Sequence, residues 1–225
     1  MAMWAFTRKK ILRTNHSHGF SLIELLVVVG ILSILIAAAI PALTSSSNHA
    51  RRASSEIVQA QLQQARAHAI SSGHPTALAV PELGSPDELG GRAISILQVK
   101  KIESGYVPLA KDQAPYQLLQ RWERLPGNFF LVSSSQLGST TPTFIDLTDR
   151  LEIRDRGSVL RCHMLVFNST GQVVHPPPGN TLLIALAQAV DRGGALTLTQ
   201  KNQGKPVVDQ LTVNRLTGRT RSLSL

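Results

Sequence analysis

Residues 19–41 read GFSLIELLVVVGILSILIAAAIP, and this stretch decides how the rest of the chain is interpreted. From Leu25 to Leu43 the 19 residues carry no charge, and as an α-helix rising about 1.5 Å per residue they approach the ~30 Å hydrocarbon core of a bilayer. Residues 1–18 hold four basic residues and no acidic residue. By the positive-inside rule, that end stays cytoplasmic and the bulk of the chain lies outside the inner membrane.

Three kinds of N-terminal segment fit this pattern. They are a secretory signal peptide cut near Ala37-Ala38-Ala39, a plain single-span anchor, and a leader that is cut after Gly19. Glu24 distinguishes them, because a carboxylate in an apolar helix costs about 2.5–3.5 kcal/mol and needs a partner. A cut after Gly19 would free the amine of Phe20, which could neutralise Glu24 of a neighbouring subunit and set the register of assembly.

The run from Gly19 to Val27 resembles the processing signature of the type IV pilin and pseudopilin superfamily. The shared features are a basic leader ending in glycine, a phenylalanine after it, and a glutamate at the fifth mature residue, Glu24. Pro41 lies where members carry a helix-kinking proline. The resemblance implies that a prepilin peptidase cuts between Gly19 and Phe20 and methylates the new amine of Phe20. It also implies assembly with other pilin subunits through Phe20, Glu24 and Pro41, and no cofactor.

Beyond the membrane run, the helix is predicted to continue as an amphipathic segment. Apolar residues recur there at spacings of four, three and four, which places them on one helical stripe that must dock on a sheet. The stripe consists of Val58, Leu62, Ala65 and Ala69. Gly73 followed by Pro75 is a helix stop signal.

After Gly73 the pattern changes to short strands separated by clusters of turn residues. Strands are expected at Thr76–Val80, Ala93–Lys100, Tyr116–Trp122, Asn128–Ser133, Val159–Phe167, Thr181–Val190, Ala195–Gln200, Val207–Arg215 and Arg219–Leu223. Residues 133–157 are expected to form an irregular loop with a short helical turn. The fold class is therefore α+β, a long N-terminal helix packed on an antiparallel β-sheet head.

These patterns divide the chain into four parts. Residues 1–19 are the leader, 20–43 the transmembrane and assembly helix, 44–73 its amphipathic continuation, and 74–225 the β-rich head. The head is expected on the periplasmic side, in the membrane-anchored protein or in a fibre.

Within the superfamily, the head resembles the GspH/FimT-type minor pseudopilins in three short runs. They are QQARAHAI at residues 63–70, FNSTG at residues 167–171 and VNRLTGRTR at residues 213–221. Residues 81–160 match that group poorly and look expanded. That middle part is closer to pilin-like proteins of the Verru_Chthon cassette group, and the sequence leaves both assignments open.

The sequence offers little chemistry. Its single cysteine, Cys162, excludes a disulfide framework and a thiolate zinc site, and the histidines show no metal-ligand spacing. Cys162 and His163 are adjacent in a predicted strand, so they point to opposite faces and make a poor nucleophile–base pair. Acids spaced by three suggest one face of a polar turn rather than a calcium loop. They are Asp146, Asp149, Glu152 and Asp155. No motif indicates an enzyme.

The C-terminus carries a candidate site for an anionic partner. The chain has a formal net charge of +9, and from Arg192 onward six basic residues face one acid. The run Gly218-Arg219-Thr220-Arg221 resembles the tail motif of the competence minor pilin that binds DNA, with Arg215 expected to fold back beside it. The alternative is a closing hairpin with solvated arginines.

Together these observations predict a minor pilin or pseudopilin rather than an enzyme. It would be a structural component, at the tip or in the initiation complex, of a type II secretion pseudopilus or a type IV pilus. One alternative is a DNA-binding minor pilin for DNA uptake. The other is a membrane-anchored binding protein that enters no fibre.

Overall fold

The computed structural model describes residues 21–102, 105–108, 118–148, 150–155, 157–177, 179, 181–202 and 205–223. The chain divides into two compact units, Met1–Ser45 and Ser46–Leu225. One helix, α1 (Leu22–Ser72), contributes residues to both. Its first turn is closed by Ser21, whose hydroxyl accepts a hydrogen bond from the Glu24 N–H at 3.2 Å.

In the first unit, the described side chains of residues 21–36 are all exposed, and most of them are large and apolar. A search of the described residues finds no helix that is both apolar enough and long enough to cross a membrane.

The second unit contains two antiparallel sheets. The first has the order β3-β2-β1-β7-β6, with β4 pairing with β2 and β8 with β7. Its strands are β1 (Thr76–Pro81), β2 (Ala93–Ile102), β3 (Gly105–Pro108), β4 (Glu123–Arg124), β6 (Arg150–Asp155), β7 (Ser158–Phe167) and β8 (Val173–His175). A 3-10 turn, η1 (Pro86–Glu88), lies between β1 and β2.

The second sheet has the order β10-β9-β13-β14, with β5 pairing with β9. Its strands are β5 (Phe129–Leu131), β9 (Thr181–Asp191), β10 (Leu196–Leu198), β13 (Val208–Asn214) and β14 (Thr220–Leu223). A separate two-stranded ribbon is formed by β11 (Lys201–Asn202) and β12 (Lys205–Pro206). Two short helices, α2 (Ser134–Leu137) and α3 (Phe144–Leu147), follow β5.

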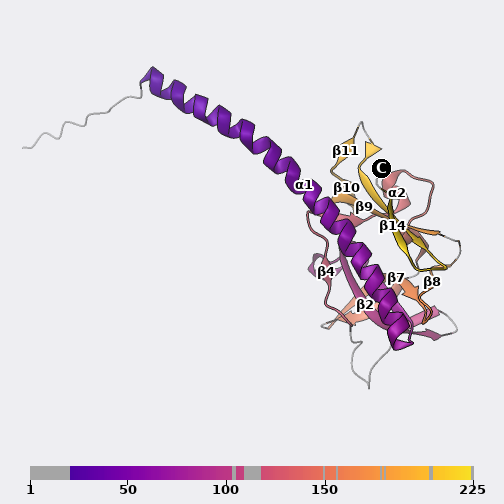
Figure 1. Ribbon diagram of the computed structural model, residues 1–225. Helices are drawn as coiled ribbons and strands as arrows, with labels where there is room; N and C mark the ends of the chain where they lie inside the picture. Colours follow the sequence, from indigo (N-terminus) through magenta and orange to yellow (C-terminus); the bar gives the residue numbers. More distant parts are fainter. Residues whose placement is uncertain are drawn as a thin grey trace, which may run out of the picture. The chain divides into compact units, whose positions relative to one another are not determined.

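The predicted stripe of α1 forms the centre of the main core. Val58, Leu62, Ala65 and Ala69 are all 0% exposed and pack against apolar residues of both sheets, such as Leu165 and Leu211. Figure 1 shows this part of α1 lying across the strands of the head. Each fully buried leucine of this core stabilises the fold by about 1.5–3 kcal/mol. The α+β architecture expected from the sequence, a helix packed on an antiparallel sheet head, is confirmed.

Ion pairing also fixes α1 to the second sheet. The Arg51 guanidinium donates to both carboxylate oxygens of Asp209, in β13. The hydrogen bond to Asp209 raises the pKa of Arg51. This bidentate pair holds the part of α1 near the start of the second unit against the second sheet.

Two of the predicted segments differ in the structure. The expected loop over residues 133–157 contains β6, whose residues Leu151 and Ile153 alternate inward with exposed Glu152 and Arg154. Glu152 and Asp155 therefore lie on a strand, and the interpretation of the spaced acids as a polar turn is wrong there. Asp149 lies outside the described residues.

The expected strand Tyr116–Trp122 is wrong over its described part. Leu118 forms only an isolated bridge with Leu97, and pairing with β2 resumes at β4. Between them, the Ser95 hydroxyl donates to the Gln120 carbonyl at 2.6 Å, so a side chain satisfies a backbone group that a ladder would otherwise pair.

Candidate functional sites

The residues predicted for processing and assembly are only partly visible. Gly19 and Phe20 lie outside the described residues. Glu24 lies in the first turn of α1 and is exposed. Pro41 is inside α1, and its side chain lies outside the described residues. The side chain of Glu24 thus lies on the surface of the first unit.

The structure separates the three C-terminal arginines. Arg219 and Arg221 are exposed, and Arg221 lies opposite Thr212 in the β13–β14 pairing. Arg215 is only 7% exposed, and its Nε and Nη2 have no hydrogen-bond partner among the described residues. Burial lowers the pKa of the Arg215 guanidinium. A shared surface of all three arginines is therefore absent, and the exposed pair remains.

Two turns, one in residues 167–171 and one in residues 213–221, meet in the second unit. Both are closed by an asparagine side chain: Asn168 Oδ1 accepts from Thr170, and Asn214 Oδ1 accepts from Thr217. Gly218 has a φ of +64°, and a Cβ there would lie 2.2 Å from the carbonyl oxygen of Gly171. Both turns need glycine because they pack against each other and against Arg66 of α1.

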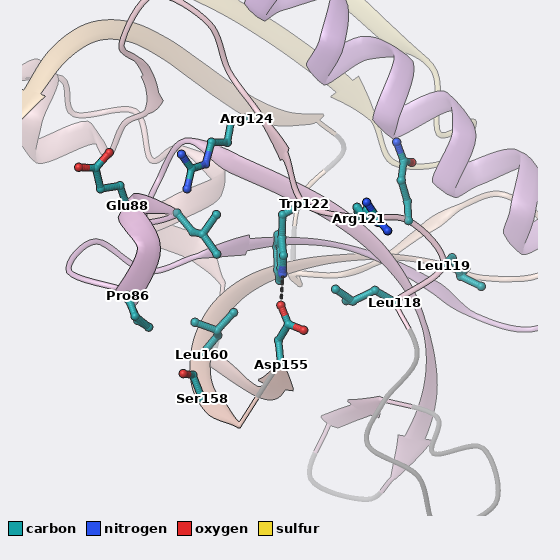
Figure 2. Close-up of a pocket in the computed structure, with 12 residues that line it drawn as sticks. Pro86, Glu88, Leu118, Leu119, Arg121, Trp122, Arg124, Asp155, Ser158 and Leu160 are labelled. Carbon is teal, nitrogen blue, oxygen red and sulfur yellow. Dashed lines mark hydrogen bonds between the residues drawn. The ribbon is translucent and has the colours of Figure 1, made fainter.

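A surface groove of about 860 Å³ surrounds Trp122. It is lined by Pro86, Glu88, Leu89, Leu118, Leu119, Gln120, Arg121, Trp122, Arg124, Asp155, Ser158 and Leu160. Every one of these residues falls within residues 81–160. The Trp122 indole donates its Nε1–H to Asp155 at 2.9 Å, which fixes the ring in the groove (Figure 2).

The walls of this groove combine apolar side chains with charges. Figure 2 shows Trp122 between Leu118 and Leu119 on one side and Glu88 and Arg124 on the other. Leu119 is 43% exposed. Glu88 also lines the groove, and its φ of +54° is a conformation that costs a non-glycine residue energy. We call this surface the Trp122 groove.

A second cavity, of about 510 Å³, has His163 in its wall. The Thr148 hydroxyl donates to the Phe144 carbonyl, so the 2.8 Å hydrogen bond between Thr148 and His163 Nδ1 is donated by the imidazole. Nδ1 therefore carries the proton of the neutral ring. Burial is the main cause that lowers the pKa of His163, so the ring is held in its uncharged form.

Cys162 faces away from His163, as the strand spacing predicted. It is fully buried among apolar residues such as Leu160 and Met164, and burial raises the pKa of its thiol to about 12. Such a thiol is a packing residue rather than a nucleophile. Over the described part of the chain, no three His, Cys, Asp or Glu residues are placed to hold a metal ion.

Residues 14–40 match the model of the prokaryotic N-terminal methylation motif. The matched residues include the whole run from Gly19 to Val27, so the N-terminal methylation motif expected there is confirmed.

Two crystal structures of the Pseudomonas aeruginosa type IV minor pilin FimU are similar to this chain. In space group P65 the identity is 16%, with 76% of this chain and 91% of that chain covered and a TM-score of 0.39. In space group P21 the identity is 15%, with 80% of this chain and 92% of that chain covered and a TM-score of 0.40. No curated protein sequence matches the chain.

The Trp122 groove is the part of the second unit that the sequence did not predict. It is built by the segment 118–122, by β4 and η1, and by the adjoining ends of β6 and β7, which approach one another only in the folded sheet. One signal was available: Trp122 is the only tryptophan beyond the leader, and it stands beside Arg121. The predicted strand over Tyr116–Trp122 concealed it, because a strand residue is expected to pack in a sheet.

Proposed function

We propose that this chain is a minor pilin or pseudopilin that assembles through α1 and carries its head into a fibre. The methylation motif at residues 14–40 is the observation that carries the proposal. In this proposal the protein is anchored in the inner membrane, with the N-terminus cytoplasmic and the head outside. Its partners are a prepilin peptidase, the inner membrane and other pilin subunits.

The continuity of α1 supports this function. The helix begins with the exposed apolar residues of the motif and ends in the stripe that packs on the head. In this proposal the first part of α1 makes the subunit contacts, and the same helix continues into the segment that packs on the sheets. A structural subunit needs no catalytic group, and the tip or initiation position is part of the proposal.

Processing is tested by Gly19→Arg. The peptidase requires a small residue before the cut, so the variant should accumulate as full-length precursor in membranes. Precursor and mature forms are separated by gel mobility and identified by mass spectrometry, which also detects methylation of Phe20. Normal mature protein from Gly19→Arg would contradict the proposal.

Assembly is tested separately by Glu24→Leu. The variant should be cleaved and stable yet absent from sheared fibres, because Glu24 pairs with the Phe20 amine of a neighbour while its loss favours insertion of the apolar helix. Ser33→Ala, in the same part of α1, is the matched control and should enter fibres normally. Incorporation of Glu24→Leu at the control level would show that Glu24 does not set the register of assembly.

A second candidate, a DNA-binding minor pilin for DNA uptake, is favoured by the exposure of Arg219 and Arg221. In this version the guanidinium groups contact phosphates, Gly218 shapes the turn, and Arg215 contributes no direct contact because it is buried. Each phosphate contact adds about 0.9 to the slope of log affinity against log salt.

The test is a titration of the unit Ser46–Leu225 against short duplexes at several salt concentrations. Replacing Arg219 and Arg221 together with alanine should lower the salt slope by about two. Arg192→Ala, an exposed arginine in another loop, should leave the slope nearly unchanged. Absence of binding at low salt, or an unchanged slope in the double variant, would remove the DNA-uptake role.

A further inference from the structure

We propose that the Trp122 groove binds a segment of a partner polypeptide that carries an apolar side chain next to a carboxylate. The groove uses none of the residues assigned to processing, helix packing or DNA contact. This inference therefore goes beyond the assembly role, and it names a recognition surface on the head itself.

The apolar side chain is accommodated by the floor of the groove. Leu89 and Leu160 are nearly buried there, and Trp122 and Leu118 pack onto the same cluster while still lining the open space. Leu119 leaves 43% of its surface exposed beside them. A partner's leucine or phenylalanine placed on Trp122 would cover this area, and a Trp next to an Arg is the composition of binding hot spots.

The carboxylate is selected by Arg121. This side chain is exposed and lines the groove, and it forms no ion pair within the described residues. The other charges are placed differently: Asp155 accepts the hydrogen bond of Trp122, and Glu88 and Arg124 lie on the opposite side of the ring from Leu118 and Leu119 in Figure 2. Arg121 is the cation that remains for a partner's carboxylate.

The size and charge of the groove favour a polypeptide over a membrane surface. A volume of about 860 Å³ exceeds that of one side chain and matches a short segment. Glu88 and Asp155 balance the charges of Arg121 and Arg124 in the lining, so the groove has no net positive charge to attract an anionic lipid surface.

The chain offers a direct reporter, because its two tryptophans are Trp4 and Trp122. In full-length Trp4→Phe protein in non-ionic detergent, emission comes from Trp122 alone. The probe is the peptide acetyl-Ser-Leu-Asp-Leu-Ser-amide, compared with the same peptide carrying Lys in place of Asp. We expect a saturable change in Trp122 emission, with the Asp peptide binding about tenfold more tightly than the Lys peptide, equivalent to 1.4 kcal/mol.

Substitution of Arg121 decides the origin of this preference. Arg121→Glu should reverse it in favour of the Lys peptide, whereas Arg192→Glu, an exposed arginine outside the groove, should leave it unchanged. Leu119→Ser should weaken both peptides equally.

Three results would overturn the inference: no saturable change with either peptide, equal binding of both peptides, or a preference that survives Arg121→Glu. A shift in emission on anionic phosphatidylglycerol vesicles without peptide binding would assign the groove to a lipid surface instead. Glu24→Leu should bind the peptides normally, so failure of fibre assembly and failure of the groove are distinguishable.

Discussion

At His163, burial opposes the charged form of the imidazole, which lies near Glu82, Arg150 and Asp146. Its pKa is lowered in the folded protein, so on acidification the unfolded chain takes up this proton first, below about pH 6.5. Stability is therefore present above that pH and is lost as the pH falls toward the folded pKa. Wild type should lose more free energy of unfolding than His163→Gln between about pH 7.5 and about pH 5.5, measured by urea unfolding. Equal losses would show that His163 is not the group responsible.

At the scale of elements, the two asparagine turns are coupled through Gly218. Gly218 and Gly138 share a φ of +64°, but a Cβ meets the Gly171 carbonyl at 2.2 Å in the first case and nothing within 4 Å in the second. In both alanine variants the left-handed conformation lowers the free energy of unfolding by about 1 kcal/mol. Only Gly218→Ala also forces the two turns apart, which lowers it by about 1–3 kcal/mol more. Thermal or urea unfolding measures the difference. Equal destabilisation would mean that the turns move apart freely.

For the whole molecule, the boundary that matters lies at Ser46 rather than at the end of α1. Residues 46–72 supply the helix stripe around which both sheets form their shared core. The fragment Ser46–Leu225 should fold and unfold in one cooperative transition, whereas a fragment of residues 74–225 should expose that core and stay unfolded. Circular dichroism and urea unfolding of the two fragments test this. A folded, cooperative 74–225 fragment would show that the sheets need no helix.

Much of this architecture was readable in the sequence because its signals are local. The stripe from Val58 to Ala69, the stop at Gly73 and most strands follow from periodicity and turn residues. β6 was missed because charged residues fill its exposed face, although Leu151 and Ile153 alternate as a half-buried strand requires. The Trp122 groove and the burial of Arg215 were beyond prediction, since both depend on which strands become neighbours.

The solitary buried thiol of Cys162 has a consequence for molecules that unfold under oxidising conditions. While the head is folded, Cys162 is sealed inside the sheet and poorly ionised, so air, glutathione disulfide and other oxidants cannot reach a reactive sulfur. A molecule that unfolds exposes this one thiol, which has no second cysteine in its own chain to pair with. Two such copies can then become covalently linked, and a dimer band on a non-reducing gel would count the misfolded molecules directly.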